Sequence, residues 1–423
     1  MLDQREEPTR DRTAVELFAG GGGLAMAVQR AGFRPLLFNE YAKRACETLA
    51  ANGAELLGEG QEPYLPALGE PCPLVMGDVR KVDFEYLRGR VDVLAGGPPC
   101  QPFSLGGVAK GDEDERNMFP QMFRAVRETE PKAVICENVR GLLRPSFKPY
   151  FDYILRELEL PFNERQEGVT WQEHDAVLSQ RIKVEDTDPS KRYRVVMTPV
   201  NAADYGVPQV RNRIIIVAFR ADLGVDIERF KKLVKPEFSE MALIHSMITG
   251  DYWDRHAVPA KVRESVLARL PKTLPVTDGK RPWRTLRDAI AGIDGAKPLP
   301  PVPVEWLDRK EHNLGGFTDH IGWPDARIYN GHTPNELDRP AKTVKAGVHG
   351  VPGGESVMLL DDGTHRYMTV RETARVMTFP DDWTLSGPRG EKMRQLGNAV
   401  PVVLGEVFAK AVADVLEEAE SRQ

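Results

Sequence analysis

The chain has 423 residues, a formal net charge of −6 and 41% hydrophobic residues, a composition typical of a folded protein. At this length two domains are expected, and no apolar run approaches the roughly 20 residues of a membrane helix. The first twelve residues are charged and polar, which excludes a secretory signal, and the four cysteines lack the CxxC spacing of a zinc site. We therefore expect a cytoplasmic protein with neither a metal nor a membrane partner.

The first predicted elements are a strand, a glycine loop and a helix. A strand is predicted over 13–18, four consecutive glycines occupy 20–23, and a helix is predicted over 24–31. Such glycines let backbone N–H groups approach a ligand near a helix N-terminus. A second strand over 33–38 is followed by Glu40, at the spacing of an acid that binds a ribose hydroxyl. The pattern indicates a nucleoside-bearing cofactor, and by spacing alone NAD also fits.

Further strands end at residues that carry reactive groups. Asp78 closes a short apolar run, Cys100 follows residues 91–94 through two glycines and two prolines, and Glu137 follows residues 133–136. In a parallel sheet these strand ends share one edge, where open α/β sheets bind their ligands. A thiol on a proline-stiffened turn is a candidate nucleophile, and a nearby carboxyl group suits proton transfer. Burial as a small hydrophobe is the alternative for a free cysteine.

Helices are predicted over 41–51, 118–129 and 150–160, where apolar residues recur at helical spacing. The polar stretch 161–192 shows little periodicity. We interpret it as an excursion from the domain without a predicted element.

Two arginines lie between the next two predicted strands, 194–200 and 214–219. Arg211 and Arg213 are two residues apart, so in an extended chain they share one face. Two guanidinium groups on one face suit an anion or a carbonyl oxygen. The alternative is a pair of surface cations beside a strand.

From about residue 220 the composition changes, and residues 253–287 contain nine cations but three acids. Tryptophans lie within this stretch, so we interpret it as a phosphate-facing surface rather than an ordinary solvated face. The predicted domains are a first domain over 1–220, which carries the glycine loop and the reactive strand ends, and a smaller second domain over 221–368. A segment over 369–423 is predicted to return to the first domain.

Eight motifs, in this order, resemble those of the C5 cytosine DNA methyltransferase family, and together they cover nearly the whole chain. They are Phe18-Ala-Gly-Gly-Gly, Asn39-Glu40, Gly77-Asp78, Pro98-Pro99-Cys100-Gln101, Glu137-Asn138-Val139, Gln209-Val-Arg211-Asn-Arg213, Arg339-Pro-Ala-Lys-Thr343-Val and Gly397-Asn398-Ala-Val400-Pro.

The resemblance implies an α/β fold: a Rossmann-like S-adenosylmethionine-dependent methyltransferase sheet with helices on both faces, plus a smaller irregular target-recognition domain. It implies an enzyme that transfers a methyl group from S-adenosyl-L-methionine to C5 of cytosine in double-stranded DNA at a specific sequence. By resemblance, the residues that bind the cofactor are Phe18, Ala19, Gly20, Gly22, Glu40, Tyr41, Asp78, Pro98, Asn398 and Val400.

The resemblance also assigns roles in catalysis. Cys100 is expected to add covalently to C6, which makes C5 nucleophilic. Glu137 is expected at N3 of the cytosine and Arg213 at O2, while Arg211 helps to keep the thiolate charged and placed. Because the target carbon lies inside a duplex stack, the base must be flipped out.

The expected partner is double-stranded DNA, which a monomer binds, and a cognate restriction endonuclease acting separately is compatible with this family. The expected DNA contacts are Gln101, Ser104, Arg255, Arg281 and Arg284.

Three other readings remain open at the level of sequence. A transfer-RNA cytosine methyltransferase shares the fold, but the Cys-Phe-Thr signature of those relatives is absent, since all four cysteines precede residue 137. A nicotinamide dehydrogenase explains the glycine loop and Glu40 but gives no role to Cys100 or Glu137. A non-catalytic DNA-binding relative is disfavoured because nucleophile, acid and arginines are all present.

Overall fold

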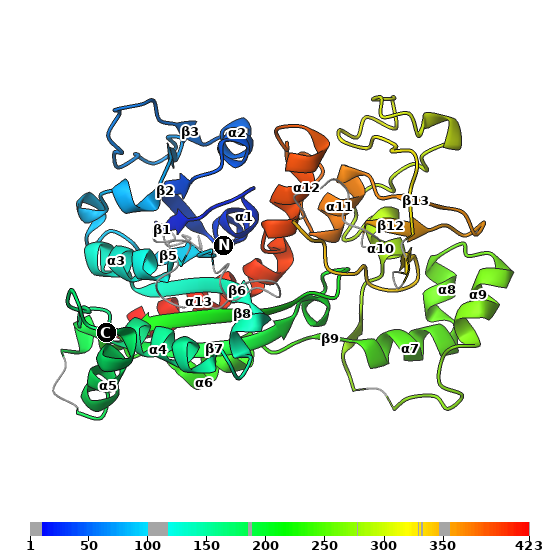
Figure 1. Ribbon diagram of the computed structural model, residues 1–423. Helices are drawn as coiled ribbons and strands as arrows, with labels where there is room; N and C mark the ends of the chain where they lie inside the picture. The colour runs from blue at the N-terminus through cyan, green and yellow to red at the C-terminus, as the bar shows by residue number, and fades with distance from the viewer. Residues whose placement is uncertain are drawn as a thin grey trace, which may run out of the picture.

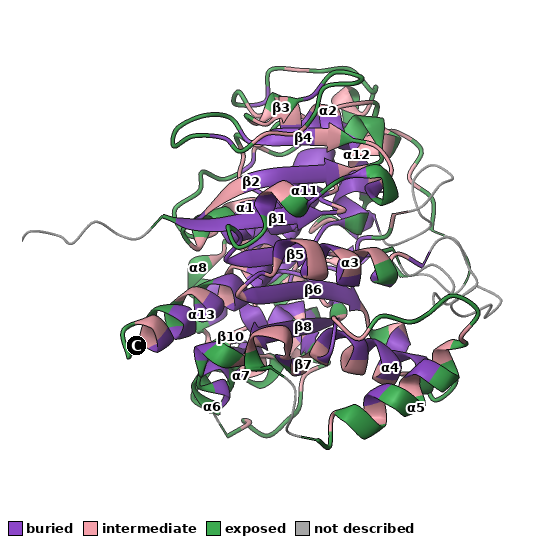
Figure 2. Cartoon of the chain, turned by 90° about the vertical axis from the view of Figure 1, so that its left-hand side faces the viewer, coloured by how far each residue is buried: buried purple, intermediate pink, exposed green. Residues whose placement is uncertain are grey.

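The computed structural model describes residues 11–99, 117–184, 188–276, 278–328, 330, 333–346 and 356–422. An eight-stranded sheet with the order β3-β4-β2-β1-β5-β6-β8-β7 forms the centre of the larger part (Figures 1 and 2). Its strands are β1 (Arg12–Leu17), β2 (Phe33–Glu40), β3 (Glu55–Leu56), β4 (Pro73–Met76), β5 (Val93–Gly96), β6 (Ala133–Val139), β7 (Tyr193–Asn201) and β8 (Asn212–Arg220).

The register of the sheet brings the strand ends to one edge. Strands β1 to β6 run parallel, while β8 pairs antiparallel with both β6 and β7. Leu17 pairs with Asn39 on one side and with Gly96 on the other, and Gly96 pairs with Cys136. The glycine loop, the Pro98-Pro99 turn and Glu137 therefore start from neighbouring positions on the carboxyl edge of the sheet.

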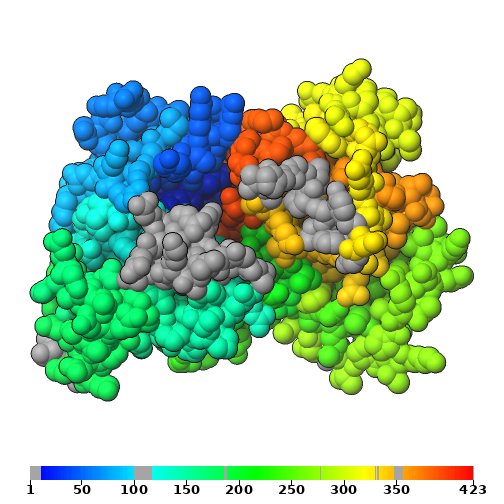
Figure 3. Space-filling view, viewed as in Figure 1, coloured from blue at the N-terminus to red at the C-terminus, as the bar shows by residue number. Residues whose placement is uncertain are grey.

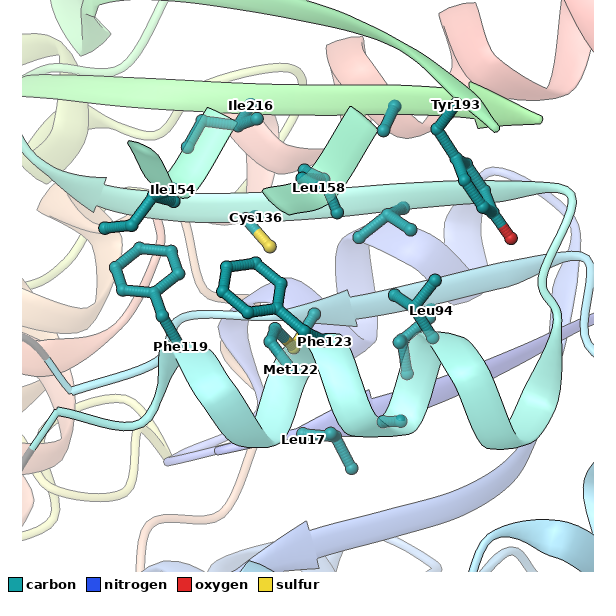
Figure 4. Close-up of a cluster of buried hydrophobic side chains, with 14 of the residues drawn as sticks. Leu17, Leu94, Phe119, Met122, Phe123, Cys136, Ile154, Leu158, Tyr193 and Ile216 are labelled. Atoms are coloured by element: carbon teal, nitrogen blue, oxygen red, sulfur yellow. The ribbon is translucent and has the colours of Figure 1, made fainter. Parts of the chain in front are cut away.

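Both faces of the sheet are buried, because alternate strand residues point to opposite sides. One face packs against α1 (Gly23–Arg30) and α13 (Val402–Glu420), through Leu24, Val28 and the apolar side of α13. The other face packs against α3 (Phe119–Thr129) and α4 (Lys148–Glu159). Figure 4 shows this second core, where α3 and α4 meet around Cys136 of β6. The predicted Rossmann-like sheet with helices on both faces is confirmed.

The remaining helices of the larger part lie around this sheet. They are α2 (Lys43–Ala51), α5 (Trp171–Arg181) and α6 (Ile227–Leu233). Helix α5 lies inside the polar stretch 161–192, for which the sequence predicted no element. Only His174 and Leu178 of α5 are buried, so its apolar pattern is too sparse to show a helical period.

The smaller part lies beside the sheet (Figures 1 and 3) and has short elements. Helices α7, α8 and α9 share a separate apolar cluster that includes Tyr252 and Trp253. The elements are β9 (Phe238–Ser239), α7 (Glu240–Thr249), α8 (Asp251–Arg255), α9 (Ala260–Leu267), β10 (Arg281–Pro282), α10 (Leu286–Ala291), β11 (Asn335–Glu336), β12 (Val357–Leu359), β13 (His365–Tyr367), α11 (Val370–Val376) and α12 (Arg389–Asn398). The domain boundaries at residues 220 and 368 stay a prediction.

The two ends of the described fold meet at the edge of the sheet where β1 and β6 begin. Arg12 at the start of β1 lies 3.4 Å from Glu420 at the end of α13, and Lys132 lies 2.6 Å from the same carboxylate. Within the described ranges, no helix is both long and apolar enough to cross a membrane.

Candidate active site

A cavity of about 470 Å³ opens at the carboxyl edge of the sheet, between the N-terminal strands and α12. Figure 3 shows the hollow beside the blue N-terminal residues, facing the orange-red C-terminal part. Many residues named by the motifs line it, although they come from distant parts of the sequence. Those lining residues are Phe18, Ala19, Gly20, Glu40, Tyr41, Pro98, Glu137, Arg211, Arg213, Asn398 and Val400.

The glycine loop allows close packing that any side chain would prevent. Gly20 and Gly22 adopt φ values of +56° and +88°, a region that favours glycine. A Cβ atom on Gly23 would lie 2.3 Å from the carbonyl oxygen of Val400, and one on Gly22 would lie 2.6 Å from the Trp383 ring. The loop therefore packs closely against Val400 and Trp383, and Gly22 faces the Trp383 ring rather than the cavity.

Glu40 ties the second strand to the glycine loop. Its carboxylate accepts hydrogen bonds from the backbone N–H groups of Gly20 and Ala42, both at 2.7 Å. These bonds hold the carboxylate at the rim of the cavity while leaving it lone pairs for further donors. Tyr41 beside it is 77% exposed, so its ring offers an apolar surface at the cavity mouth.

Glu16 is a site residue that the sequence analysis missed. It lies on β1, lines the cavity and is buried, and its Oε2 has no hydrogen-bond partner among the described residues. Burial raises the pKa of this carboxyl group well above its usual range, with the Glu40 charge adding to the effect. The available signal was a single acid inside an otherwise apolar strand. An unpartnered buried oxygen suits a cationic ligand group.

Glu137 and Arg213 meet at the base of the cavity. Glu137 lies two residues before the end of β6 and Arg213 is the second residue of β8, and Arg213 Nε lies 2.7 Å from Glu137 Oε1. Next to them, the Asn138 side-chain amide donates to the carbonyl oxygen of Pro98 at 3.0 Å. The acid, the arginine and the turn that precedes Cys100 in the sequence are thereby fixed to one another.

Arg211 is fully buried, and its two Nη atoms donate to three backbone carbonyl groups, while Nε has no partner among the described residues. Nη1 donates to Val344 at 2.9 Å, and Nη2 donates to Gly397 at 2.8 Å and to Ala399 at 3.0 Å. Burial lowers the pKa of this guanidinium to about 9, and the nearby Arg213 contributes. The side chain therefore joins the segment around Val344 to the end of α12, where Asn398 lines the cavity.

Two of the expected cofactor residues are not brought to the cavity. Asp78 accepts from the backbone and the guanidinium of Arg80, and the Arg80 hydrogen bonds lower the pKa of its carboxyl group. Neither Asp78 nor Gly22 is among the described residues that line the cavity. Cys100, Gln101 and Ser104 lie outside the described residues.

The three arginines expected on DNA lie in the smaller part and have acidic neighbours. Arg284 pairs with Asp294 at 2.8 Å, and Arg281 with Glu237 at 2.5 Å. Arg255 lies 3.9 Å from Asp288. Arg281 and Arg284 line a second cavity of about 470 Å³, which shares no described residue with the first. Their role in DNA binding stays a prediction.

An open sheet with a ligand cavity at its carboxyl edge defines a class of α/β enzymes that bind nucleoside-bearing or related ligands there. A model of the family "C-5 cytosine-specific DNA methylase" matches residues 12–160 and 173–414. The chain belongs to this family and is an enzyme, a DNA (cytosine-5-)-methyltransferase. The dehydrogenase reading is therefore wrong. Residues 161–172, before and at the start of α5, have no counterpart in the family model.

Curated relatives match along nearly the whole chain. The type II methyltransferase M.PspPI of Psychrobacter sp. is 31% identical over 98% of this chain and 82% of its own length. The type II methyltransferase M.AplI of Arthrospira platensis is 28% identical over 96% of this chain and 87% of its own length. The solved structure of the S. pombe Dnmt2 methyltransferase shares the fold, with a TM-score of 0.52 at 14% identity, covering 96% of this chain and 99% of that one.

Proposed function

We propose that this methyltransferase uses S-adenosylmethionine to methylate C5 of cytosine at a specific sequence in double-stranded DNA, through a covalent bond between Cys100 and C6. The observation that carries the proposal is the contact of Arg213 with Glu137, 2.7 Å apart in a cavity whose wall includes Pro99. Cys100 is the next residue in the sequence. Acid, cation and thiol are the groups that addition to a cytosine ring requires.

The described cavity suits S-adenosylmethionine as the methyl donor. Glu40 at the rim retains acceptor capacity for ribose hydroxyl groups, and Tyr41 offers a flat apolar surface beside it. The unpartnered oxygen of Glu16 suits the cationic methionine end of the donor. S-adenosylmethionine supplies a methyl group on a positively charged sulfur, which becomes a neutral thioether after transfer.

The protein's own groups activate the cytosine. The Cys100 thiolate forms a bond to C6, and the electron pair of the C5=C6 bond shifts so that N3 and O2 gain negative charge and C5 becomes nucleophilic. Glu137 donates a proton or hydrogen bond to N3, and Arg213 donates to O2. Once C5 carries the methyl group, a base removes the C5 proton. The electron pair of that C–H bond re-forms C5=C6 and expels the thiolate, and N3 returns its proton to Glu137.

Access to C5 requires that the cytosine leave the duplex. Unstacking and unpairing the base costs about a few kcal/mol, which contacts with phosphates and with the vacated space must offset. We propose Gln101 and Ser104 at the target nucleotide and Arg255, Arg281 and Arg284 along the duplex. A monomer suffices for this arrangement.

The names of the curated relatives support a place in a type II restriction-modification system. In such a system a separate endonuclease cuts the same sequence when it is unmethylated. We propose that this chain supplies the protective modification in the cytoplasm, where the host DNA lies.

Trapping with a 5-fluorocytosine duplex tests the proposal, because fluorine at C5 blocks the proton removal that releases the enzyme. With the methyl donor present, we expect a covalent protein–DNA adduct at Cys100. Cys100→Ser should form no adduct and transfer no methyl group while binding the donor normally. An adduct on transfer RNA but not on duplex DNA would overturn the DNA assignment. Bisulfite sequencing of DNA from an expressing host then identifies the methylated sequence.

A further inference from the structure

The stretch 161–182, which contains α5, is docked firmly on the catalytic part although the family model leaves 161–172 unmatched. Arg156 of α4 forms two hydrogen bonds with Asp175 of α5, at 2.6 and 2.8 Å. Arg127 of α3 donates to the carbonyl oxygen of Pro161 at 3.1 Å. Leu178 is fully buried in the core that α3 and α4 share with the sheet. We call this stretch the α5 extension.

Trp171 at the start of α5 packs against two tyrosines of α4. Its ring lies edge-on to Tyr150, with centroids 5.2 Å apart and planes at 82°, and 5.7 Å from the ring of Tyr153. The Tyr153 hydroxyl contacts His174 Nδ1 at 3.1 Å, and His174 belongs to α5. Both tyrosines are buried and contact Trp171, and their hydroxyl groups bond to different residues.

The Tyr150 hydroxyl bonds to Asn117, outside the α5 extension. The Asn117 side-chain amide donates to it at 2.5 Å, and this asparagine is 7% exposed. The following residue, Met118, donates its backbone N–H to the carbonyl oxygen of Pro99 at 3.4 Å. Asn117 and Pro99 are the described residues that flank 100–116, the stretch that begins with Cys100. One continuous set of contacts therefore runs from Trp171 through Tyr150 to this junction.

We propose that Tyr150, supported by Trp171 of the α5 extension, is a positioning residue for methyl transfer, because it fixes Asn117 at the junction with the stretch that starts at Cys100. This inference rests on the proposed function of Cys100. The buried bond between the Tyr150 hydroxyl and the Asn117 amide restricts the position of Asn117. Breaking it would leave two buried polar groups without a hydrogen-bond partner, which is costly. A small displacement of a reacting group is enough to slow a reaction that depends on orientation.

Two matched variants test the inference. Tyr150→Phe and Tyr153→Phe each remove one buried hydroxyl from α4 and keep the ring against Trp171, but only the first loses the bond to Asn117. We expect Tyr150→Phe to slow adduct formation on the 5-fluorocytosine duplex about five-fold, with unchanged affinity for S-adenosylmethionine. Tyr153→Phe should keep the wild-type rate, while the melting temperatures of the two variants fall by similar amounts. Asn117→Ala should slow the reaction equally, and adding Tyr150→Phe should slow it no further.

A wild-type rate in Tyr150→Phe, or an equal slowing in both phenylalanine variants, would overturn the inference. Trp171→Ala should slow the reaction and Trp171→Phe should restore it, because the phenyl ring retains the edge contact. If Trp171→Ala fails to fold, the two tyrosine variants still decide. Absence of an adduct with the wild-type enzyme would instead refute the proposed function of Cys100, so the two failures are distinguishable.

Discussion

Arg213 Nε lies 2.7 Å from Glu137 Oε1, where the end of β6 meets the start of β8. Both side chains are largely buried, so each neutralises the other in a poorly hydrated place. The pair is already assembled without a ligand, so a cytosine ring entering the cavity would meet a carboxyl group and a guanidinium group that are already in place.

We expect Arg213→Ala and Glu137→Gln each to lower the single-turnover rate at least about 100-fold. Because the two groups act as a unit, the double variant should be no slower than the slower single variant. Arg140→Ala, at an exposed arginine that contacts Asn212 at 3.4 Å, is the control and should leave the rate unchanged. Multiplicative losses in the double variant would contradict the paired role.

Replacing Arg211 should lower the stability of the fold, because its three hydrogen-bond acceptors are backbone carbonyl groups of the protein. Arg211→Met removes these bonds and leaves the carbonyl oxygens of Val344, Gly397 and Ala399 without that donor. We expect a loss of about 3–5 kcal/mol in the free energy of unfolding, measured with denaturant. The affinity for S-adenosylmethionine should fall as well. Arg211 bonds to Gly397, and both Gly397 and the next residue, Asn398, line the cavity. A variant of wild-type stability would show that the bonds contribute little.

Glu16 makes stability depend on pH, and the sign follows from the raised pKa of its buried carboxyl group. A raised folded-state pKa gives stability that is fully present below the unfolded value of about 4.5 and is lost as pH rises through the folded-state pKa. Without ligand, the wild-type protein should therefore lose stability relative to Glu16→Gln as the pH rises above 4.5. The difference in the free energy of unfolding should change by up to ~1.4 kcal/mol per pH unit. Denaturant unfolding of both proteins between pH 5 and 8 measures this, and parallel curves would contradict it.

Two glycine substitutions should have opposite effects. Gly23→Ala places a Cβ 2.3 Å from the Val400 carbonyl oxygen, which is backbone and cannot move aside cheaply. We expect it to destabilise the protein by about 1–3 kcal/mol and to weaken donor binding. Gly390→Ala, in α12, meets no atom within 4 Å and should stabilise by up to ~1 kcal/mol. Thermal unfolding compares the stabilities of the two variants, and calorimetric titration measures the binding of S-adenosylmethionine. Equal melting temperatures for Gly23→Ala and Gly390→Ala would contradict the packing argument.

The sequence predicted the sheet and its edge well, because short apolar runs followed by Gly, Pro or an acid are local signals of strand ends. Glu40 is the last residue of β2, and Glu137 lies two residues before the end of β6, which continues past the predicted strand. The structure places both at the cavity. Helix α5 escaped prediction because its contacts with α4 use two aromatic residues and few aliphatic ones, which leaves no clear period.

The excess of positive charge along the sequence predicted the charge of the folded surface less well. The cations of residues 253–287 exceed the acids nearby in sequence, but several are paired by acids from elsewhere. Arg287 bonds to both Asp338 and Asp361, and Arg269 to Glu336. Glu16 and the bonds of Arg211 were missed for the same reason, since the groups that give each residue its character come from distant segments.

The contact between Arg12 and Glu420 has a consequence for the gene as well as for the protein. A linker of a few residues could close the backbone into a ring, and an opening at an exposed loop would then create new ends without breaking the sheet. The three-dimensional arrangement therefore does not require the motifs to follow this one order along the gene.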